Sequence, residues 1–168
     1  PGADSSQAVI LGAHIDSPNG PGAFDDGSGS AALLEVARVL DVSKIQPPVD
    51  IYLAWFGGHE IGTYGSAYFV ATHQPLLDQT LAMVQMDGLG YPLEGRLSKI
   101  TMLLTSYGRF GDERLPLPDF LSKTVAGQGL SLDQMVEYGL IADNSNFDAF
   151  NVPNVYLGYM NTQELQIK

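Results

Sequence analysis

Histidine and acidic residues stand at several points of this sequence where an apolar run has just ended. The run Ala8–Ala13 is typical of a strand buried on both faces, and His14 and Asp16 follow it directly. Residues two apart in a strand point to the same side, so this imidazole and this carboxylate can lie together. One can bind a metal ion while the other orients the imidazole; the alternative is a polar pair that only ends the strand.

Two further groups of metal-competent residues follow along the chain. Asp25 and Asp26 lie in a glycine-rich stretch, and adjacent carboxylates repel each other unless a cation or hydrogen-bond donors neutralise them. The alternative is that Asp26 is a helix N-cap and that Asp25 benefits from the helix dipole. His59 and Glu60 follow a pair of glycines, and either side chain can bind a metal or act as a base; the alternative is a solvated loop pair.

Asp87 ends another apolar run, where a lone aspartate is also common as a turn residue. Each candidate follows a predicted strand or precedes a predicted helix, at the sheet edge where ligands of α/β proteins gather. Nitrogen and oxygen ligands suit Zn²⁺ or a similar divalent ion, and a bridging carboxylate suits two ions about 3.5–4 Å apart. Taken together, these residues favour a metal site over the separate structural explanations.

The elements that must position these residues alternate along the chain. Apolar runs predict strands at 8–13, 49–56, 81–86, 100–105 and 155–159. Amphipathic spacing and flanking prolines predict helices at 28–40, 65–73, 118–127 and 146–151, the second of them ended by Pro75. This alternation predicts one α/β domain over residues 1–168, with three layers: a mostly parallel or mixed central sheet and helices on both faces.

The composition excludes several classes of protein. The 168 residues include 8 Lys and Arg against 19 Asp and Glu, a net charge of −11, which argues against nucleic acid and anionic membrane surfaces as partners. The absence of Cys excludes disulfides, zinc–thiolate sites and thiol nucleophiles. No apolar run is long enough to span a bilayer. The opening residues 1–6 run straight into an apolar strand, from which we expect a fragment of a longer protein.

Four segments carry a resemblance to a known family: GAHIDS, GPGAFDDGSGSAALLEVARVL, IYLAWFGGHEIGTYGSAYFV and VQMDGLGY. They resemble, in order and spacing, the co-catalytic zinc exopeptidases of peptidase family M28, which contains secreted leucyl-type aminopeptidases, glutamate carboxypeptidases and glutaminyl cyclases. The resemblance runs from about Val9 to Met160 and includes the late segment Ala142–Phe147. It implies a zinc exopeptidase fold, a peptide substrate and export from the cell.

The resemblance also implies a role for each candidate residue. His14 and Asp87 would bind the first zinc ion, Asp25 would bridge two ions, and Glu60 would bind the second. Asp16 would be the carboxylate that orients His14, and Asp26 would support the bridging loop.

Two features depart from the family pattern. The family usually has Glu-Glu where this chain has His59-Glu60, and the first Glu takes the proton from the attacking water. An imidazole, with an unperturbed pKa of about 6.5, can act as that base, and adjacent metal ions would keep it neutral. The family also supplies a late His to the second metal, whereas no His follows His73 here. We therefore expect two zinc ions in a complete site and one or none in this chain, with His59 as a less favoured substitute ligand.

Three functions follow from this sequence. The first is a metal-dependent exopeptidase of aminopeptidase type, with His59 and Asp16 as catalytic residues. The second is a non-hydrolytic relative that serves as a binding or scaffold domain, and the third is a glutaminyl cyclase with a single zinc ion. We also expect Asp143 and Asp148 to cap or solvate the late segment, and Tyr107, Arg109 and Phe110 to line a specificity pocket.

Overall fold

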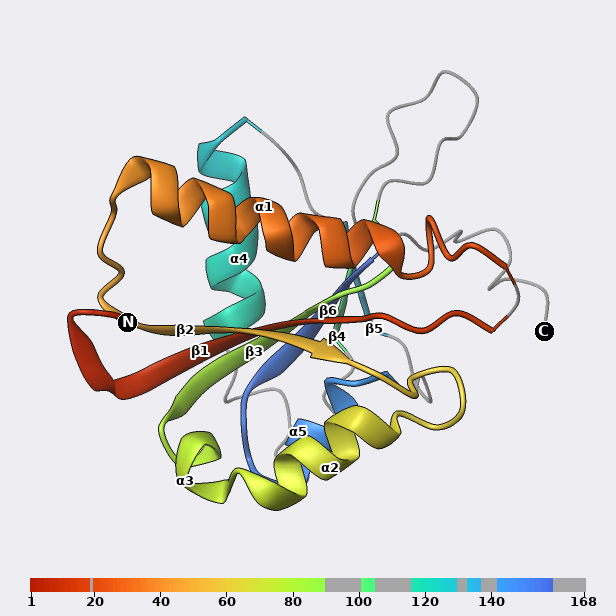
Figure 1. Cartoon of the computed structure of the whole chain (residues 1–168). Coiled ribbons are helices and arrows are strands. Elements are labelled where there is room, and N and C mark those ends of the chain that lie inside the picture. Colours follow the sequence, from red (N-terminus) through yellow and green to blue (C-terminus); the bar gives the residue numbers. More distant parts are fainter. Residues whose placement is uncertain (19, 90–100, 105–115, 130–132, 137–141, 159–168) are drawn as a thin grey trace.

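The computed structural model describes residues 1–18, 20–89, 101–104, 116–129, 133–136 and 142–158 (Figure 1). The strands are β1 (Asp4–His14), β2 (Val49–Phe56), β3 (Thr80–Met86), β4 (Thr101–Leu104), β5 (Asp133–Val136) and β6 (Asn154–Gly158). The helices are α1 (Gly27–Ser43), α2 (Tyr64–Thr72), α3 (Gln74–Leu77), α4 (Pro116–Gly127) and α5 (Ser145–Asp148). No helix within these ranges is both long and apolar enough to cross a membrane.

The described strands form one mixed sheet in the order β2-β1-β3-β6-β4-β5. Strands β2, β1, β3 and β6 are mutually parallel, whereas β4 pairs with β6 in the antiparallel direction and with β5 in the parallel direction. Because β1, β2 and β3 are parallel neighbours, their carboxyl ends meet at one edge of the sheet. The register places His14, the last residue of β1, beside Phe56, the last residue of β2.

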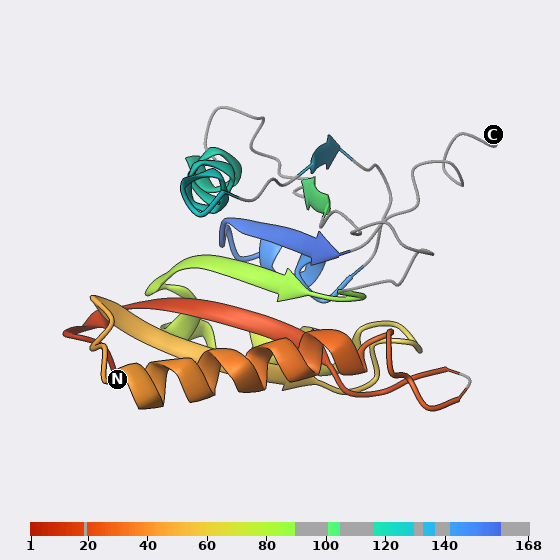
Figure 2. The ribbon, with the colours of Figure 1, turned by 90° about the horizontal axis from the view of Figure 1, so that it is seen from above.

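Helices cover both faces of the sheet, which confirms the predicted fold class. Helices α1 and α4 lie over one face, and α2, α3 and α5 lie over the other (Figures 1 and 2). Neighbouring residues of β1 serve the two faces in turn, because side chains alternate along a strand. Ile10 packs in a cluster with Phe147 of α5, whereas Leu11 packs against a cluster of β3 and β6 residues that α4 also contacts. The apolar run of β1 is therefore buried on both sides.

The sequence missed two short elements of the described structure, β5 and α3. Strand β5 has the sequence Asp-Gln-Met-Val, which carries no apolar run, and it exists as a strand through its ladder with β4. Pro75 does not merely end the preceding helix, as the sequence predicted. It occupies the first turn of α3, where its fixed φ and missing N–H are tolerated. Residues 107–110, expected to line a specificity pocket, lie outside the described residues.

Candidate metal centre

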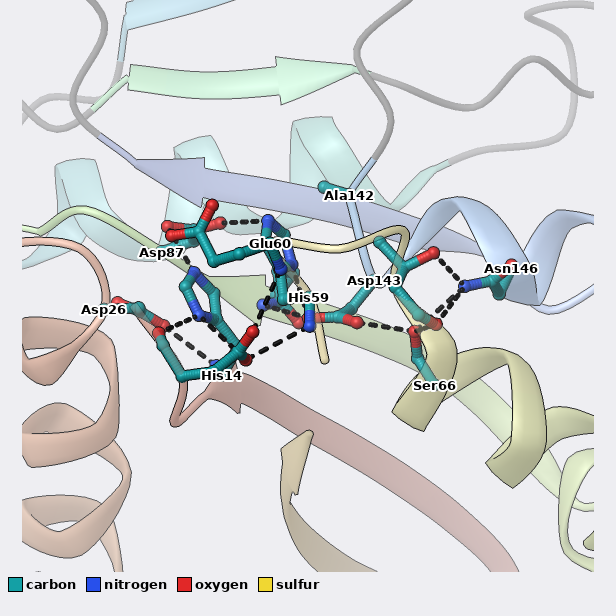
Figure 3. A network of polar contacts seen from close by, with 12 residues as sticks. His14, Asp26, His59, Glu60, Ser66, Asp87, Ala142, Asp143 and Asn146 are labelled. Carbon is teal, nitrogen blue, oxygen red and sulfur yellow. Dashed lines mark hydrogen bonds and ion pairs between the residues drawn. The ribbon is translucent and has the colours of Figure 1, made fainter. Parts of the chain in front are cut away.

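The candidate residues come from the ends of three strands and from the start of α1, at one edge of the sheet (Figure 3). His14 ends β1, and Asp87 follows β3. His59 and Glu60 lie in the turn after β2, and Asp25 lies just before the cap of α1. The structure thus brings together all five side chains that the sequence proposed as metal ligands or base. They meet because three parallel strands end side by side and α1 begins at the same edge.

His14 lies at the centre of this cluster. Its side chain is fully buried, and its Nε2 atom lies 3.0 Å from Asp25 Oδ1 and 3.5 Å from Asp87 Oδ1. One ligand atom each of His14, Asp25 and Glu60 lies within 4.8 Å of the others. The imidazole and these two carboxylates, with the Asp87 carboxylate also close to the ring nitrogen, form a donor set that suits a divalent cation.

The electrostatics of the cluster also fit a cation. Among the described residues, His14 Nε2 and Glu60 Oε1 are buried atoms with no hydrogen-bond partner, which is rare for buried polar atoms. The ion pairs that Lys and Arg form within the described ranges are Arg38 with Glu35 on α1 and Lys44 with Asp41 at its C-terminal end, and both pairs are exposed. Among the described residues, these Lys and Arg pairs therefore leave the carboxylates of the cluster without a Lys or Arg partner, and a divalent ion would supply the missing positive charge.

Without a metal ion, a proton on His14 supplies positive charge to the cluster instead. Burial lowers the pKa of this imidazole, but the nearby carboxylate of Asp87, together with the charges of Asp26 and Asp25, outweighs burial. The net effect raises the pKa of His14 to about 9. Without a metal ion, His14 is therefore protonated at neutral pH, and a metal ion would have to displace that proton.

Asp26 joins three of the segments that carry these residues. Its buried carboxylate accepts hydrogen bonds from the backbone N–H groups of His14 (3.0 Å), Gly29 (2.9 Å) and Gly88 (3.1 Å). The bond from Gly29 confirms Asp26 as the N-cap of α1. Burial and the charge of Asp87 raise its pKa to about 6, and the three hydrogen bonds oppose that rise. Asp26 thus ties β1, α1 and the end of β3 together behind the cluster.

Asp16 makes contacts that differ from the expected one. Its carboxylate lies 3.7 Å from His14 Nδ1, too far for a hydrogen bond, and its backbone carbonyl takes the imidazole contact at 3.0 Å instead. The carboxylate accepts the backbone N–H groups of His59 (3.1 Å) and Glu60 (3.0 Å). Burial raises the pKa of Asp16, but these backbone bonds outweigh it and the pKa ends below its ordinary value. Asp16 therefore holds the β2 loop against the end of β1.

His59 stacks on His14 and pairs with a distant carboxylate. The two ring centroids lie 3.9 Å apart at an interplanar angle of 6°. His59 Nδ1 lies 2.9 Å from Asp143 Oδ2, and Nε2 lies 3.9 Å from Asp87 Oδ2. Burial lowers the pKa of His59, but the hydrogen bond and charge of Asp143 outweigh burial and raise it overall.

The stacking argues against one ion shared by both imidazoles. One nitrogen of each ring and an oxygen of Asp87 lie within 4.8 Å of one another, which by distance alone is a possible metal site. However, the nitrogen lone pair lies in the plane of its ring, and a Zn–N bond is about 2.0–2.1 Å long. An ion in the plane of His14 would lie about a stacking distance from the parallel plane of His59. As placed, His59 is oriented as a neighbour of the metal cluster and not as a ligand.

Asp143 is the site residue that sequence reasoning missed. We expected it to cap or solvate the late segment, but its side chain is fully buried and contacts His59, Ser66 and Gln85. The expectation was wrong because an aspartate before a short helix has no local feature that distinguishes a cap from a buried acceptor. The only signal was its place in the late segment Ala142–Phe147, where the family resemblance continued.

Comparison with known proteins identifies the family of the chain. The profile described as peptidase family M28 matches residues 1–163. The chain belongs to peptidase family M28. Leucine aminopeptidase 1 of Ajellomyces capsulatus is 31% identical over 139 residues, which cover 73% of this chain and 34% of that protein.

Solved structures of aminopeptidases share the fold. The LapA aminopeptidase of Legionella pneumophila is 27% identical with a TM-score of 0.80, covering 94% of this chain and 42% of that one. BSAP, a zinc aminopeptidase from Bacillus subtilis, is 24% identical with a TM-score of 0.79, covering 100% of this chain and 40% of that one. This chain thus spans between about a third and two fifths of the length of these M28 relatives.

Proposed function

We propose that this M28 chain carries the metal centre of a zinc-dependent exopeptidase of aminopeptidase type, which removes N-terminal residues from peptides. The observation that carries the proposal is the convergence of His14 Nε2, Asp25, Glu60 and Asp87 at one edge of the sheet, with two buried ligand atoms that lack any described hydrogen-bond partner. The names of the relatives support the same activity. The domain proposed over residues 1–168 would be part of a longer protein.

Each residue of the cluster has a proposed task. His14 and Asp87 would hold a first ion, Glu60 a second, and Asp25 would bridge the two. When bound, zinc supplies Lewis acidity that polarises the scissile carbonyl and makes water a stronger acid. One ion suffices for the donors around His14, and the occupancy of the Glu60 side depends on whether a further ligand completes it.

His59 is the proposed base. Its Nδ1 atom is engaged by Asp143, so its Nε2 atom, on the side of Asp87, is the one that can take a proton from the attacking water and return it to the leaving amine. Asp16 supports this role by holding the backbone of His59 and Glu60. The surrounding carboxylates would also attract the free α-amino group of a peptide.

Zinc titration followed by hydrolysis of leucine 4-nitroanilide tests the proposal. We expect turnover that requires zinc, a loss of about 10²–10⁴-fold in kcat for His59→Ala, and partial retention for His59→Glu, which restores the carboxylate base usual in the family. His73→Ala is the matched control, because His73 is exposed beyond the end of α2. Undiminished turnover in His59→Ala would exclude His59 as the base.

The same histidine favours a second candidate, a non-hydrolytic relative that binds a metal ion without catalysis. An imidazole is bulkier than a carboxylate and directs its nitrogen lone pair differently, so the substitution can abolish the proton transfer. Zinc binding without turnover, both on leucine 4-nitroanilide and on peptides with N-terminal glutamine, would favour this candidate. Cyclisation of the glutamine peptides alone would instead indicate a glutaminyl cyclase.

A further inference from the structure

Asp143 is a buried carboxylate that receives donors from three different elements. Its Oδ1 atom accepts the Ser66 hydroxyl of α2 at 2.5 Å. Its Oδ2 atom accepts His59 Nδ1 at 2.9 Å and the Gln85 side-chain amide of β3 at 3.4 Å. The side chain of Asp143 is 0% exposed, as are those of Ser66 and Gln85. A carboxylate is costly to bury, so three donors aimed at it indicate a constructed acceptor site.

A hydrogen bond from Asn146 helps to direct the Ser66 hydroxyl proton toward Asp143. The side-chain amide of Asn146 donates to Ser66 Oγ at 2.9 Å and to Thr63 Oγ1 at 3.0 Å. A hydroxyl has a single proton, and Ser66 Oγ has Asp143 as its shortest acceptor, with the Thr63 carbonyl at 3.0 Å as the other. The chain of donors from Asn146 through Ser66 therefore ends on Asp143 (Figure 3). The position of the carboxylate does not depend on His59 alone.

The fixed carboxylate determines which nitrogen of His59 carries the proton. A neutral imidazole has one N–H donor and one acceptor nitrogen, and the hydrogen bond of one nitrogen decides the state of the other. Because Asp143 can only accept as a carboxylate, His59 Nδ1 is the donor and Nε2 keeps its lone pair. That lone pair lies on the side of Asp87, 3.9 Å from Oδ2.

The orientation of the ring is held from two further directions. The imidazole of His14 stacks on one face at 3.9 Å, which opposes rotation of the His59 ring out of its plane. The backbone N–H of His59 is bonded to Asp16, which fixes the origin of the side chain. With the ring plane and the backbone fixed, the remaining freedom is a half-turn of the ring about its Cβ–Cγ bond, which would exchange Nδ1 with Cδ2 and Nε2 with Cε1. The bond from Nδ1 to Asp143 selects the orientation in which Nε2, and not Cε1, lies on the side of the metal cluster.

We propose that Asp143 is a positioning residue that holds His59 in the Nδ1–H tautomer and presents the Nε2 lone pair to the metal cluster. This inference rests on the proposed function, in which His59 is the base. It explains how an imidazole can stand in the place where the family usually has a glutamate: the histidine comes with a buried carboxylate that fixes its tautomer. The rival explanation is that Asp143 only anchors α5 against α2 and the sheet.

Two-bond ¹⁵N–¹H correlation spectra of the ¹⁵N-labelled chain test the proposal without reference to turnover. The three histidines are assigned with single substitutions, and spectra are recorded with and without zinc at an alkaline pH where the His59 ring is neutral. We expect the Nδ1–H pattern for His59 in the unsubstituted chain. An Nε2–H pattern there would overturn the proposal, whatever the variants do.

Two variants separate positioning from anchoring. Asp143→Ala removes the acceptor and is expected to release the Nδ1–H tautomer and to lower kcat by about 10–100-fold with little change in KM, as for other outer partners of a site. Ser66→Ala is the matched control, since it removes a buried donor to the same carboxylate but leaves the bond to His59; its tautomer pattern should stay unchanged. An unchanged tautomer in Asp143→Ala would overturn the proposal.

A double-variant comparison protects the test from misfolding and from failure of the proposed function. Asp143→Asn keeps an oxygen acceptor, so it should keep more of the tautomer and of the turnover than Asp143→Ala. In a His59→Ala background, Asp143→Asn should have no further effect on kcat, and an undiminished effect there would favour anchoring. If the chain shows the Nδ1–H pattern but no turnover with zinc, the proposed function fails and the positioning role stands.

Discussion

The pH dependence of zinc binding follows from the position of His14. The atom expected to bind the metal ion, Nε2, is fully buried between Asp25 and Asp87, and those carboxylates favour a proton there as much as a cation. Burial lowers the pKa of His14, but Asp87, Asp26 and Asp25 together raise it to about 9. A metal ion must displace this proton, so zinc affinity should rise with pH and level off above about pH 9.

The size of the effect follows from the pKa. At pH 7 the pKa of about 9 leaves roughly one chain in 100 with a neutral His14, so the apparent affinity for zinc should be about 100-fold weaker than above pH 9. That corresponds to about 2.7 kcal/mol of binding free energy. Between pH 7 and 8.5 the affinity should rise by nearly tenfold for each pH unit.

The raised pKa of His14 also makes the stability of the metal-free chain depend on pH, and this stability should fall as the pH rises, whereas zinc affinity should increase. The pKa of His14 is about 9 when folded and 6.5 when unfolded, so the folded state binds the proton more tightly. The stabilisation from His14 is fully present below about pH 6.5 and is lost as the pH rises through about 9, a contribution of about 3 kcal/mol. Bound zinc would remove this loss, because the ion replaces the proton.

Calorimetric titration with zinc in two buffers of different ionisation enthalpy measures the protons released. At pH 7 we expect at least one proton per ion, and His59→Gln isolates the share of His14 by removing the stacked imidazole. His73→Gln should leave both the affinity and the proton count unchanged, since His73 is exposed at the end of α2. Zinc affinity that is constant from pH 7 to 8.5, or binding at pH 7 without proton release, would refute this account of His14.

Three further predictions concern the frame around the cluster. Asp26→Ala leaves three buried backbone N–H groups without their acceptor and should lower the free energy of unfolding, measured by urea denaturation, by about 2–4 kcal/mol. It should also lower the affinity for zinc. Unchanged stability would contradict the role of Asp26 as a link between segments. Gly65→Ala places a Cβ 2.4 Å from the Gly57 carbonyl oxygen, so it should lower the free energy of unfolding by about 1–3 kcal/mol. It should also weaken zinc binding, because the clash displaces the loop that carries His59. Normal zinc affinity in that variant would show that the loop tolerates the displacement. Lys44→Gly should raise the free energy of unfolding by about 1 kcal/mol and the melting temperature by a few degrees, because Lys44 has a φ of 52° at the C-cap of α1, a conformation that suits glycine. The exposed ion pair of Lys44 with Asp41, which the variant loses, contributes little. A lower melting temperature would count against this reasoning.

Much of the fold could be predicted because local patterns carry it. The run Ala8–Ala13 predicts a buried strand since apolar residues without alternation suit a strand covered on both faces, and β1 contains it. The predicted strand at 49–56 has the same bounds as β2. By contrast, β5 has no apolar signature and is defined by its pairing with β4, so no local pattern could reveal it.

The sequence by itself determined which residues end strands and which of them carry metal-competent groups. His14, Glu60 and Asp87 were accessible to this reasoning, because the end of an apolar run is a local feature and parallel strands end at a common edge. Only the tertiary structure decided how those side chains are oriented. The partner of His59 is Asp143, 84 residues away, and the carboxylate of Asp16 turns from the imidazole to the backbone of the next loop. Such contacts depend on how separate elements pack, and hydrogen-bond partners between distant segments leave no periodic trace in the chain.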